Sequence, residues 1–157
     1  MQATETTAVR DVEILLVEDE PGDVELTRAA IADARALRLH VEMDGHAALD
    51  FLHRRNGREH APRPDLVLLD LNLPGLDGRD LLIELKTNPA MVEIPVVVLS
   101  GSTAPNEIQR AYRRCANAYI VKPFEHDKLV AIIRAVSSFW IETARLPPRQ
   151  KDSGAAS

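Results

Sequence analysis

The sequence lacks several features that would place it in a particular class of protein. It contains one cysteine, Cys115, which excludes an internal disulfide and fits a reducing compartment such as the cytosol. No apolar run approaches the ~18 residues of a membrane-spanning helix, and the first ten residues show no apolar core of a secretory signal. Acidic residues (24) outnumber basic ones (19), whereas a nucleic-acid surface requires clustered Lys and Arg. We therefore expect a cytoplasmic protein that binds neither nucleic acid nor a membrane.

Two common kinds of site are also missing from the sequence. Cys115 follows two arginines, but no motif of a catalytic thiol surrounds it. The five histidines show no metal-ligand spacing, such as an i, i+4 pair on a helix. We interpret all of these side chains as solvated or packing residues.

What the sequence does contain is a regular alternation of short apolar runs with amphipathic segments. Strands are predicted at residues 14–17, 39–43, 66–69, 96–99 and 118–121, the second of them with one wetter face. Helices are predicted at about residues 23–37, 47–52, 77–87, 105–114 and 125–142, with Asp23 as the N-cap of the first. Five strands alternating with five helices predict an α/β fold, in which helices cover both faces of a doubly wound parallel sheet.

The ends of the chain differ in composition from this alternating part. Residues 1–11 are polar, and the segment from Pro147 is rich in Pro, Gly and Ser. We expect a flexible N-terminal extension at 1–11, a folded domain at 12–142 and a flexible C-terminal tail at 143–157. Too little chain follows the last helix for an output domain, so the folded domain is expected to act through its own surface.

The best candidate for chemistry is Asp70, which ends the unbroken apolar run of residues 66–69. The carboxyl ends of strands in open α/β sheets are where ligands bind, although an Asp at such a position can also simply end a strand. Three further predicted strands end in polar residues: Glu18 and Asp19 after the first, Ser100 after the fourth and Lys122 after the fifth. Parallel strands bring these ends to one edge, so a shared cleft is expected.

The residue types in this cleft favour phosphoryl transfer. Three crowded carboxylates repel one another unless a cation is present, and Mg²⁺ fits best because it binds few carboxylates and engages phosphates. Lys122 carries a positive charge on a flexible stem, and Ser100 offers a hydroxyl donor for the same anion. Asp70 would then be the nucleophile and form an aspartyl phosphate.

This set of residues, with Tyr119 three positions before Lys122, resembles the receiver domain of bacterial two-component response regulators. The resemblance covers about residues 12–140 and implies a flavodoxin-like sheet with strand order 2-1-3-4-5. It also implies that Asp70 accepts a phosphoryl group from a sensor histidine kinase. Such a domain is a phosphoacceptor that catalyses its own phosphorylation and dephosphorylation, and is not otherwise an enzyme.

The resemblance also assigns a role to each residue of the cleft. Asp19 and Asp70 would bind Mg²⁺ directly, together with the backbone carbonyl of Asn72, while Glu18 acts largely through water. The phosphoryl oxygens would be bound by Ser100, Gly101 and Lys122, with Ser100 and Tyr119 as a switch pair and Pro123 joined to Lys122 by a cis peptide bond. Two positions depart from the commonest pattern: Glu18 stands where Asp is usual, and Ser100 where Thr is usual.

Longer segments sharpen the resemblance to regulators paired with phytochrome-type kinases. These are LNLPGLDGRDLLIELK, IPVVVLSGS and FWIETARLP. In that group the fourth helix, last strand and last helix commonly form a homodimer. Phe139 and Trp140 are adjacent on a helix and cannot both face one core, and Ala111 adds apolar surface on the fourth helix. The predicted interface residues are Ile108, Tyr112, Phe139 and Trp140, unless Trp140 caps the core and the tail covers Phe139.

Other functions fit the residues less well. A haloacid-dehalogenase-type phosphatase needs a second acid where this chain has Asn72. A flavodoxin-like cofactor binder needs Ser, Thr and Gly after the first strand, where residues 18–20 are all acidic. A degenerate receiver that acts only as a scaffold would lack site residues, and all are present here. A phosphorelay shuttle or a phosphate sink for another kinase remains an alternative.

Overall fold

The computed structural model of the protein describes residues 11–34 and 36–149. Its strands are β1 (Val12–Val17), β2 (Leu37–Glu42), β3 (Leu66–Asp70), β4 (Val96–Ser100) and β5 (Ala118–Val121). They form one parallel five-stranded sheet in the order β2-β1-β3-β4-β5. The expected α/β fold and its strand order 2-1-3-4-5 are therefore confirmed.

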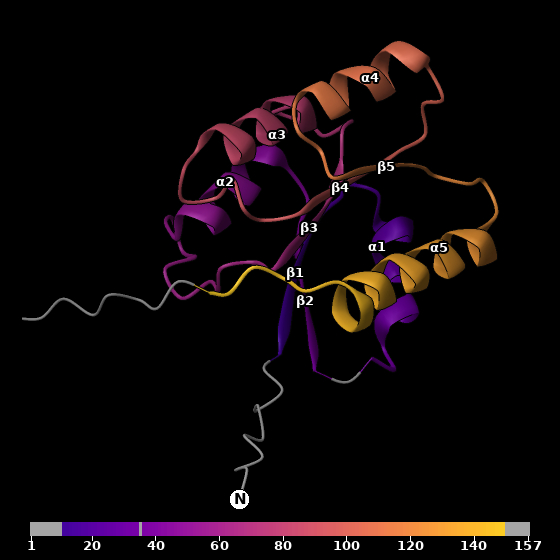
Figure 1. Ribbon diagram of the computed structural model, residues 1–157, viewed down its shortest axis with the longest axis horizontal. Coiled ribbons are helices and arrows are strands. Elements are labelled where there is room, and N and C mark those ends of the chain that lie inside the picture. Colours follow the sequence, from indigo (N-terminus) through magenta and orange to yellow (C-terminus); the bar gives the residue numbers. More distant parts are fainter. Residues whose placement is uncertain (1–10, 35, 150–157) are drawn as a thin grey trace, which may run out of the picture.

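Helices cover both faces of this sheet (Figure 1). Their bounds are α1 (Pro21–Ile31), α2 (Gly45–His53), α3 (Gly78–Thr87), α4 (Pro105–Arg113) and α5 (His126–Ser138), followed by a π-helix at Phe139–Thr143. Helices α1 and α5 pack on one face, while α2, α3 and α4 lie on the other. Among the described residues, no helix has the length and apolar character needed to cross a bilayer.

The apolar runs are unbroken because each central strand is buried on both faces. In β3, Leu66 and Leu68 point toward the α1 and α5 side, whereas Val67 and Leu69 point toward α2, α3 and α4. All of these side chains are at most 2% exposed. A strand with two buried faces has no polar alternation, which is why its sequence reads as one apolar block.

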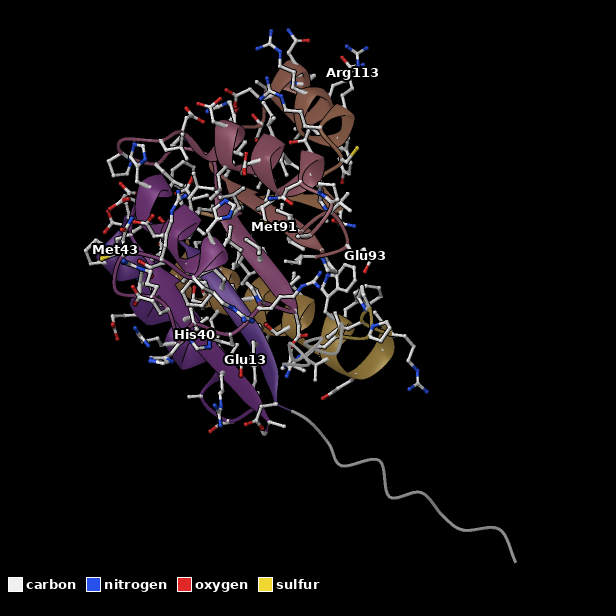
Figure 2. The ribbon with its side chains drawn as sticks, turned by 90° about the vertical axis from the view of Figure 1, so that its left-hand side faces the viewer. Glu13, His40, Met43, Met91, Glu93 and Arg113 are labelled. Atoms are coloured by element: carbon white, nitrogen blue, oxygen red, sulfur yellow. The ribbon has the colours of Figure 1, made fainter. Side chains whose placement is uncertain are left out.

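The edge strand β2 differs from the central ones in the way the sequence predicted. Its residues are only partly buried, and it carries His40, whose Nε2 lies 2.6 Å from Glu13 Oε2 on β1. Figure 2 shows these two side chains on the same side of the sheet. The buried Glu13 carboxylate therefore has a polar partner on the neighbouring strand, as a buried charge requires.

The bounds of two helices were predicted wrongly. Helix α1 begins at Pro21 with Glu20 as its N-cap, so Asp23 lies in the first turn and is not the cap. It ends at Ile31 instead of residue 37, because Leu37 already pairs with Val12 at the start of β2. The last helix is α-helical to Ser138 and then widens into the π-helix.

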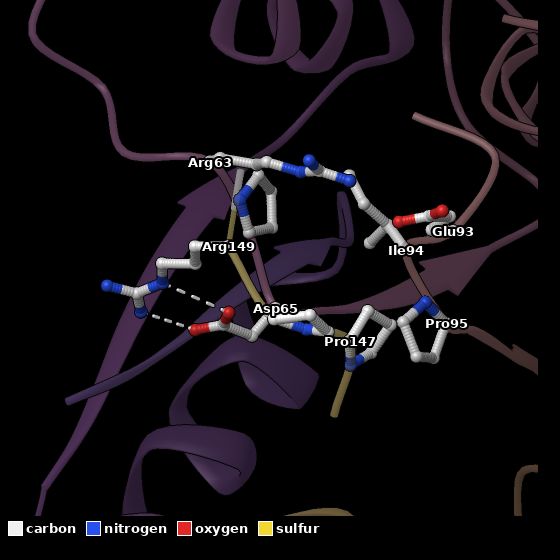
Figure 3. Close-up of a pocket in the computed structure, with 9 residues that line it drawn as sticks. Arg63, Asp65, Glu93, Ile94, Pro95, Pro147 and Arg149 are labelled. Atoms are coloured by element: carbon white, nitrogen blue, oxygen red, sulfur yellow. Dashed lines mark hydrogen bonds and ion pairs between the residues drawn. The ribbon is translucent and has the colours of Figure 1, made fainter. Parts of the chain in front are cut away.

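The chain after the π-helix lies against the domain as far as it is described. Leu146 packs on the core beside α5, and Arg149 forms an ion pair with Asp65 (Figure 3). We call residues 144–149 the C-terminal strap. Residues 1–10 and 150–157 lie outside the described residues, so the division into a domain and two flexible ends stays a prediction.

Candidate functional site

The acidic residues predicted to form the site are brought together by the register of β1 and β3. Val17 lies opposite Leu69, so the residues that follow them, Glu18 and Asp70, are neighbours at the same edge. One carboxylate oxygen from each of Glu18, Asp19 and Asp70 lies within 4.8 Å of the others. Glu18 and Asp70 are buried, and Asp19 is the most accessible of the three.

Lys122, directly after β5, places its ammonium group among these carboxylates. Its Nζ donates to Glu18 Oε2 at 2.5 Å, to Asp70 Oδ2 at 3.0 Å and to Asp23 Oδ2 at 3.0 Å. The backbone N–H of Lys122 donates to the Ser100 carbonyl at 2.8 Å, which fixes the end of β5 against β4. The predicted meeting of strand ends is therefore present, and Asp23 is a site residue that the sequence analysis missed.

The charged groups of the site shift one another's pKa values. Burial, the largest cause, and the nearby Asp70 charge raise the pKa of Glu18 to about 7, although the hydrogen bond and charge of Lys122 lower it. Burial by itself lowers the pKa of Lys122, but the hydrogen bond and charge of Glu18 outweigh it and raise that pKa well above its ordinary value. The carboxylates of the site thus carry more negative charge than the single positive charge of Lys122 balances.

This donor set fits a hard divalent cation. Its ligand atoms are carboxylate oxygens, and the three that converge within 4.8 Å belong to different residues. Mg²⁺ is bound by one or two such oxygens, with water and phosphate completing its shell. Glu18, Asp19 and Asp70 are the residues of this structure that would hold it.

The turn after β3 holds the Asp70 carboxylate in place. The backbone N–H of Asn72 donates to Asp70 Oδ1 at 2.9 Å, so both carboxylate oxygens of Asp70 have a donor. The turn closes where the Gly78 N–H donates to the Leu71 carbonyl at 3.1 Å. A Cβ at Gly78 would lie 2.2 Å from the Asp70 carbonyl oxygen, so only glycine allows α3 to begin this close to the site.

The fourth strand supplies a buried hydroxyl to the same edge. Ser100 is 0% exposed, and its Oγ accepts a hydrogen bond from the Ser102 N–H at 3.2 Å. Gly101 is exposed, and a Cβ there would meet nothing within 4 Å. Among the described residues no peptide bond is cis, so the expected cis bond between Lys122 and Pro123 was wrong.

Tyr119 links the last strand to the loop that follows β4. Its hydroxyl donates to the Ser102 carbonyl at 2.9 Å, and its ring packs against the core on the side of α2, α3 and α4. Its backbone N–H donates to the Tyr112 hydroxyl at 3.2 Å. The helix that follows this loop is also linked to α3, because Arg79 donates to Glu107 in the first turn of α4 at 2.9 Å.

The residues predicted for a dimer interface divide between core and surface. Trp140 is half-buried against the core under α5, while Phe139 is 51% exposed, and their rings meet edge to face at 5.4 Å. On α4, Tyr112 is 49% exposed and Ile108 is partly exposed. Ala111, which we expected at the surface, is only 3% exposed because it packs into the core.

Residues 14–134 match the family model described as the response regulator receiver domain. The chain is a response regulator receiver domain. As such it belongs to the phosphoacceptors of two-component signalling, whose partners are histidine kinases, and its family acts through phosphorylation-dependent signalling.

Known proteins resemble this receiver over most of its length. It is 40% identical to the response regulator Rcp1 of Synechocystis sp. over 135 residues, covering 85% of this chain and 92% of Rcp1. The crystal structure of Mn²⁺-bound Rcp1 superposes with a TM-score of 0.84 at 39% identity, covering 87% of this chain and 99% of that one. The phosphorylated cyanobacterial phytochrome response regulator RcpA gives 0.85 at 39% identity, with 88% and 99% covered. The bacteriophytochrome response regulator AtBRR gives 0.69 at 35% identity, also with 88% and 99% covered.

Proposed function

We propose that Asp70 of this receiver accepts a phosphoryl group from a sensor histidine kinase, in a reaction that requires Mg²⁺. The observation that carries the proposal is the meeting of Glu18, Asp19 and Asp70 around the Lys122 ammonium at one edge of the sheet. Mg²⁺ bound there would neutralise charge between the Asp70 carboxylate and the phosphoryl oxygens.

The transfer itself needs little covalent chemistry from the protein. A carboxylate oxygen of Asp70 forms a bond to phosphorus while the bond from phosphorus to the donor histidine nitrogen breaks, and that nitrogen leaves with the electron pair. Donors from Asn72 and Lys122 hold the two oxygens of Asp70 beforehand. Catalysis is therefore positioning and charge neutralisation, and the receiver should react with a small phosphodonor without a kinase.

After transfer, the phosphoryl oxygens need donors close to Asp70. Lys122 already contacts Asp70 Oδ2, and Ser100 and Gly101 follow the neighbouring strand. If the Ser100 hydroxyl turns toward the phosphoryl group, it gives up the hydrogen bond that it accepts from the Ser102 N–H. Tyr119 is bonded to the carbonyl of that same Ser102, so the pair Ser100 and Tyr119 can act as the switch.

For the kinase we propose a bacteriophytochrome-type sensor. The proposal is supported by the similarity over nearly the whole described domain to RcpA, a phytochrome response regulator, and to AtBRR, a bacteriophytochrome response regulator. A phosphorelay shuttle or a sink for another kinase is the less favoured alternative. The test is to measure phosphotransfer to this receiver from each histidine kinase of the host. We expect the phytochrome-type kinase to react fastest.

We further propose a homodimer through α4, β5 and the end of α5. The supporting observation is the exposure of Phe139 and Tyr112, two large apolar side chains on this part of the domain, with Ile108 partly exposed beside Tyr112. Sedimentation at micromolar concentration should show a dimer that Phe139→Ser weakens. A protein that is monomeric both before and after phosphorylation would contradict the dimer.

The phosphoacceptor is tested by mass spectrometry with a small phosphodonor and Mg²⁺. The parent protein should gain one phosphoryl group, and Asp70→Asn should gain none. Asp80→Asn, which changes an exposed acid in the first turn of α3, serves as the matched control and should be labelled normally. An Asp70→Asn protein that is labelled as strongly as the parent would refute the assignment of the acceptor. Labelling of the parent that persists in EDTA would refute the Mg²⁺ requirement.

A further inference from the structure

We infer that Asp23 is a positioning residue, which holds the ammonium group of Lys122 beside Asp70. The inference deepens the proposed function and rests on it. Asp23 Oδ2 accepts a hydrogen bond from Lys122 Nζ at 3.0 Å, the same distance as that between Lys122 Nζ and Asp70 Oδ2. This contact joins the first turn of α1 to the end of β5, 99 residues away in sequence.

The three carboxylates around Lys122 differ in whether they also belong to the cluster that fits a cation. Glu18 and Asp70 belong to the cluster that fits a divalent cation, whereas Asp23 does not. An ion in the cluster and a phosphoryl group on Asp70 would both engage oxygens that now bind Lys122. Asp23 would then be the carboxylate left to hold the lysine.

Lys122 needs such a partner because its side chain is flexible. A lysine has four rotatable methylene groups and a point charge with no fixed direction, so its position depends on what it is bonded to. Catalysis by charge neutralisation requires the cation to be in place before the reaction.

The helix that carries Asp23 is a firm support for this contact. Helix α1 buries Val24, directly after Asp23, and Thr27, one turn later, at 6% and 2% exposure against the rest of the domain. The hydroxyl of Thr27 donates to the Asp23 carbonyl at 2.8 Å, which fixes the backbone at this position. The Asp23 carboxylate therefore projects from a packed helix, and not from a free loop.

The inference is tested by the rate of phosphorylation with a small phosphodonor and saturating Mg²⁺. Asp23→Asn keeps the shape of the side chain and removes its charge, and it should lower the maximum rate roughly tenfold with little change in the donor concentration that gives half of it. Glu25→Gln removes a charge from the same helix at an exposed side chain that contacts Arg28, and should leave the rate unchanged. An Asp23→Asn protein as fast as the parent would overturn the inference.

A double-mutant comparison separates action through Lys122 from a general effect of charge. If Asp23 acts by holding the lysine, Asp23→Asn should cause no further loss in a protein that already carries Lys122→Met. A further tenfold loss in that background would refute a positioning role.

The last readout needs no phosphodonor. In proton–nitrogen correlation NMR with Mg²⁺, the ammonium group of Lys122 should be visible in the parent and in Glu25→Gln, and lost through rapid exchange with water in Asp23→Asn. A signal that is unchanged in Asp23→Asn would contradict the inference even if phosphorylation were slow. If instead Asp70→Asn is labelled normally, the proposed function fails, while this spectrum still reports on Asp23.

Discussion

The hydroxyl of Tyr119 donates a hydrogen bond to the carbonyl oxygen of Ser102 at 2.9 Å and so ties the last strand to the loop after β4. Ser102 also donates its N–H to Ser100 Oγ, so the tyrosine and the buried serine meet at one residue. In the switch that we propose, a displacement of Ser100 would reach Tyr119 through this single backbone segment.

Removing the Tyr119 hydroxyl should loosen the loop after β4. We expect Tyr119→Phe to lower the free energy of unfolding by about 1 kcal/mol, the usual net value of one hydrogen bond. Urea denaturation gives this value, and hydrogen exchange should show faster exchange at the Ser102 and Ala104 amides. Equal stability and unchanged exchange would mean that the loop does not depend on Tyr119.

The raised pKa of Glu18 predicts an unusual pH dependence in the absence of divalent ions. Between pH 4.5 and about 7, the folded protein keeps a proton on Glu18 that the unfolded chain has lost. The free energy of unfolding should therefore fall as the pH rises through this window, by up to about 3 kcal/mol. Denaturation with and without Glu18→Gln measures the contribution of this residue, because the variant should lack that part of the pH dependence.

Mg²⁺ should reverse this dependence of the free energy of unfolding on pH. The ion would bind the ionised carboxylate, so its stabilising effect should grow as the pH rises from 5 to 8 and should be reduced in Glu18→Gln. A stabilisation by Mg²⁺ that is the same at both pH values would show that Glu18 does not gain or lose a proton at the ion site.

Gly78 should tolerate no side chain. A Cβ would lie 2.2 Å from the Asp70 carbonyl oxygen and 2.6 Å from Leu71 Cα, both backbone atoms that cannot turn away. We expect Gly78→Ala to lower the free energy of unfolding by about 3 kcal/mol. Gly101→Ala is the control near the same site, where a Cβ meets nothing within 4 Å, and its effect should stay within about 0.5 kcal/mol.

The C-terminal strap should contribute to stability through Arg149. Its guanidinium donates to both carboxylate oxygens of Asp65, which is 4% exposed at the side chain and also accepts the Glu13 N–H. Arg149→Met keeps the apolar stem and should cost about 2 kcal/mol, since it removes the two hydrogen bonds that Arg149 donates to this buried carboxylate. Arg145→Met, an exposed position four residues earlier, should be close to neutral in the same denaturation experiment.

The sequence predicted the fold well because the central strands are buried on both faces. Such strands carry a signal that needs no knowledge of their neighbours, and their polar last residues predicted which side chains would meet. Asp70 and Lys122 could be placed in one site from this rule alone.

What could not be predicted depended on details of packing. Asp23 was missed because its place in the site follows from the start of α1 at Pro21, two residues earlier than the pattern indicated. The burial of Ala111 and the π-helix after Ser138 also depend on how α4 and α5 fit against the sheet. Local sequence patterns do not predict such contacts.

The position of Lys122 in the chain has a consequence for the growing polypeptide. It lies 104 residues after Glu18 and contacts the acidic cluster only once β5 has joined the sheet. A nascent chain that has formed β1 and β3 already holds the crowded carboxylates, but their cation has yet to be synthesised. Docking of the last strand thus completes the sheet and places Lys122 beside the carboxylates in the same step.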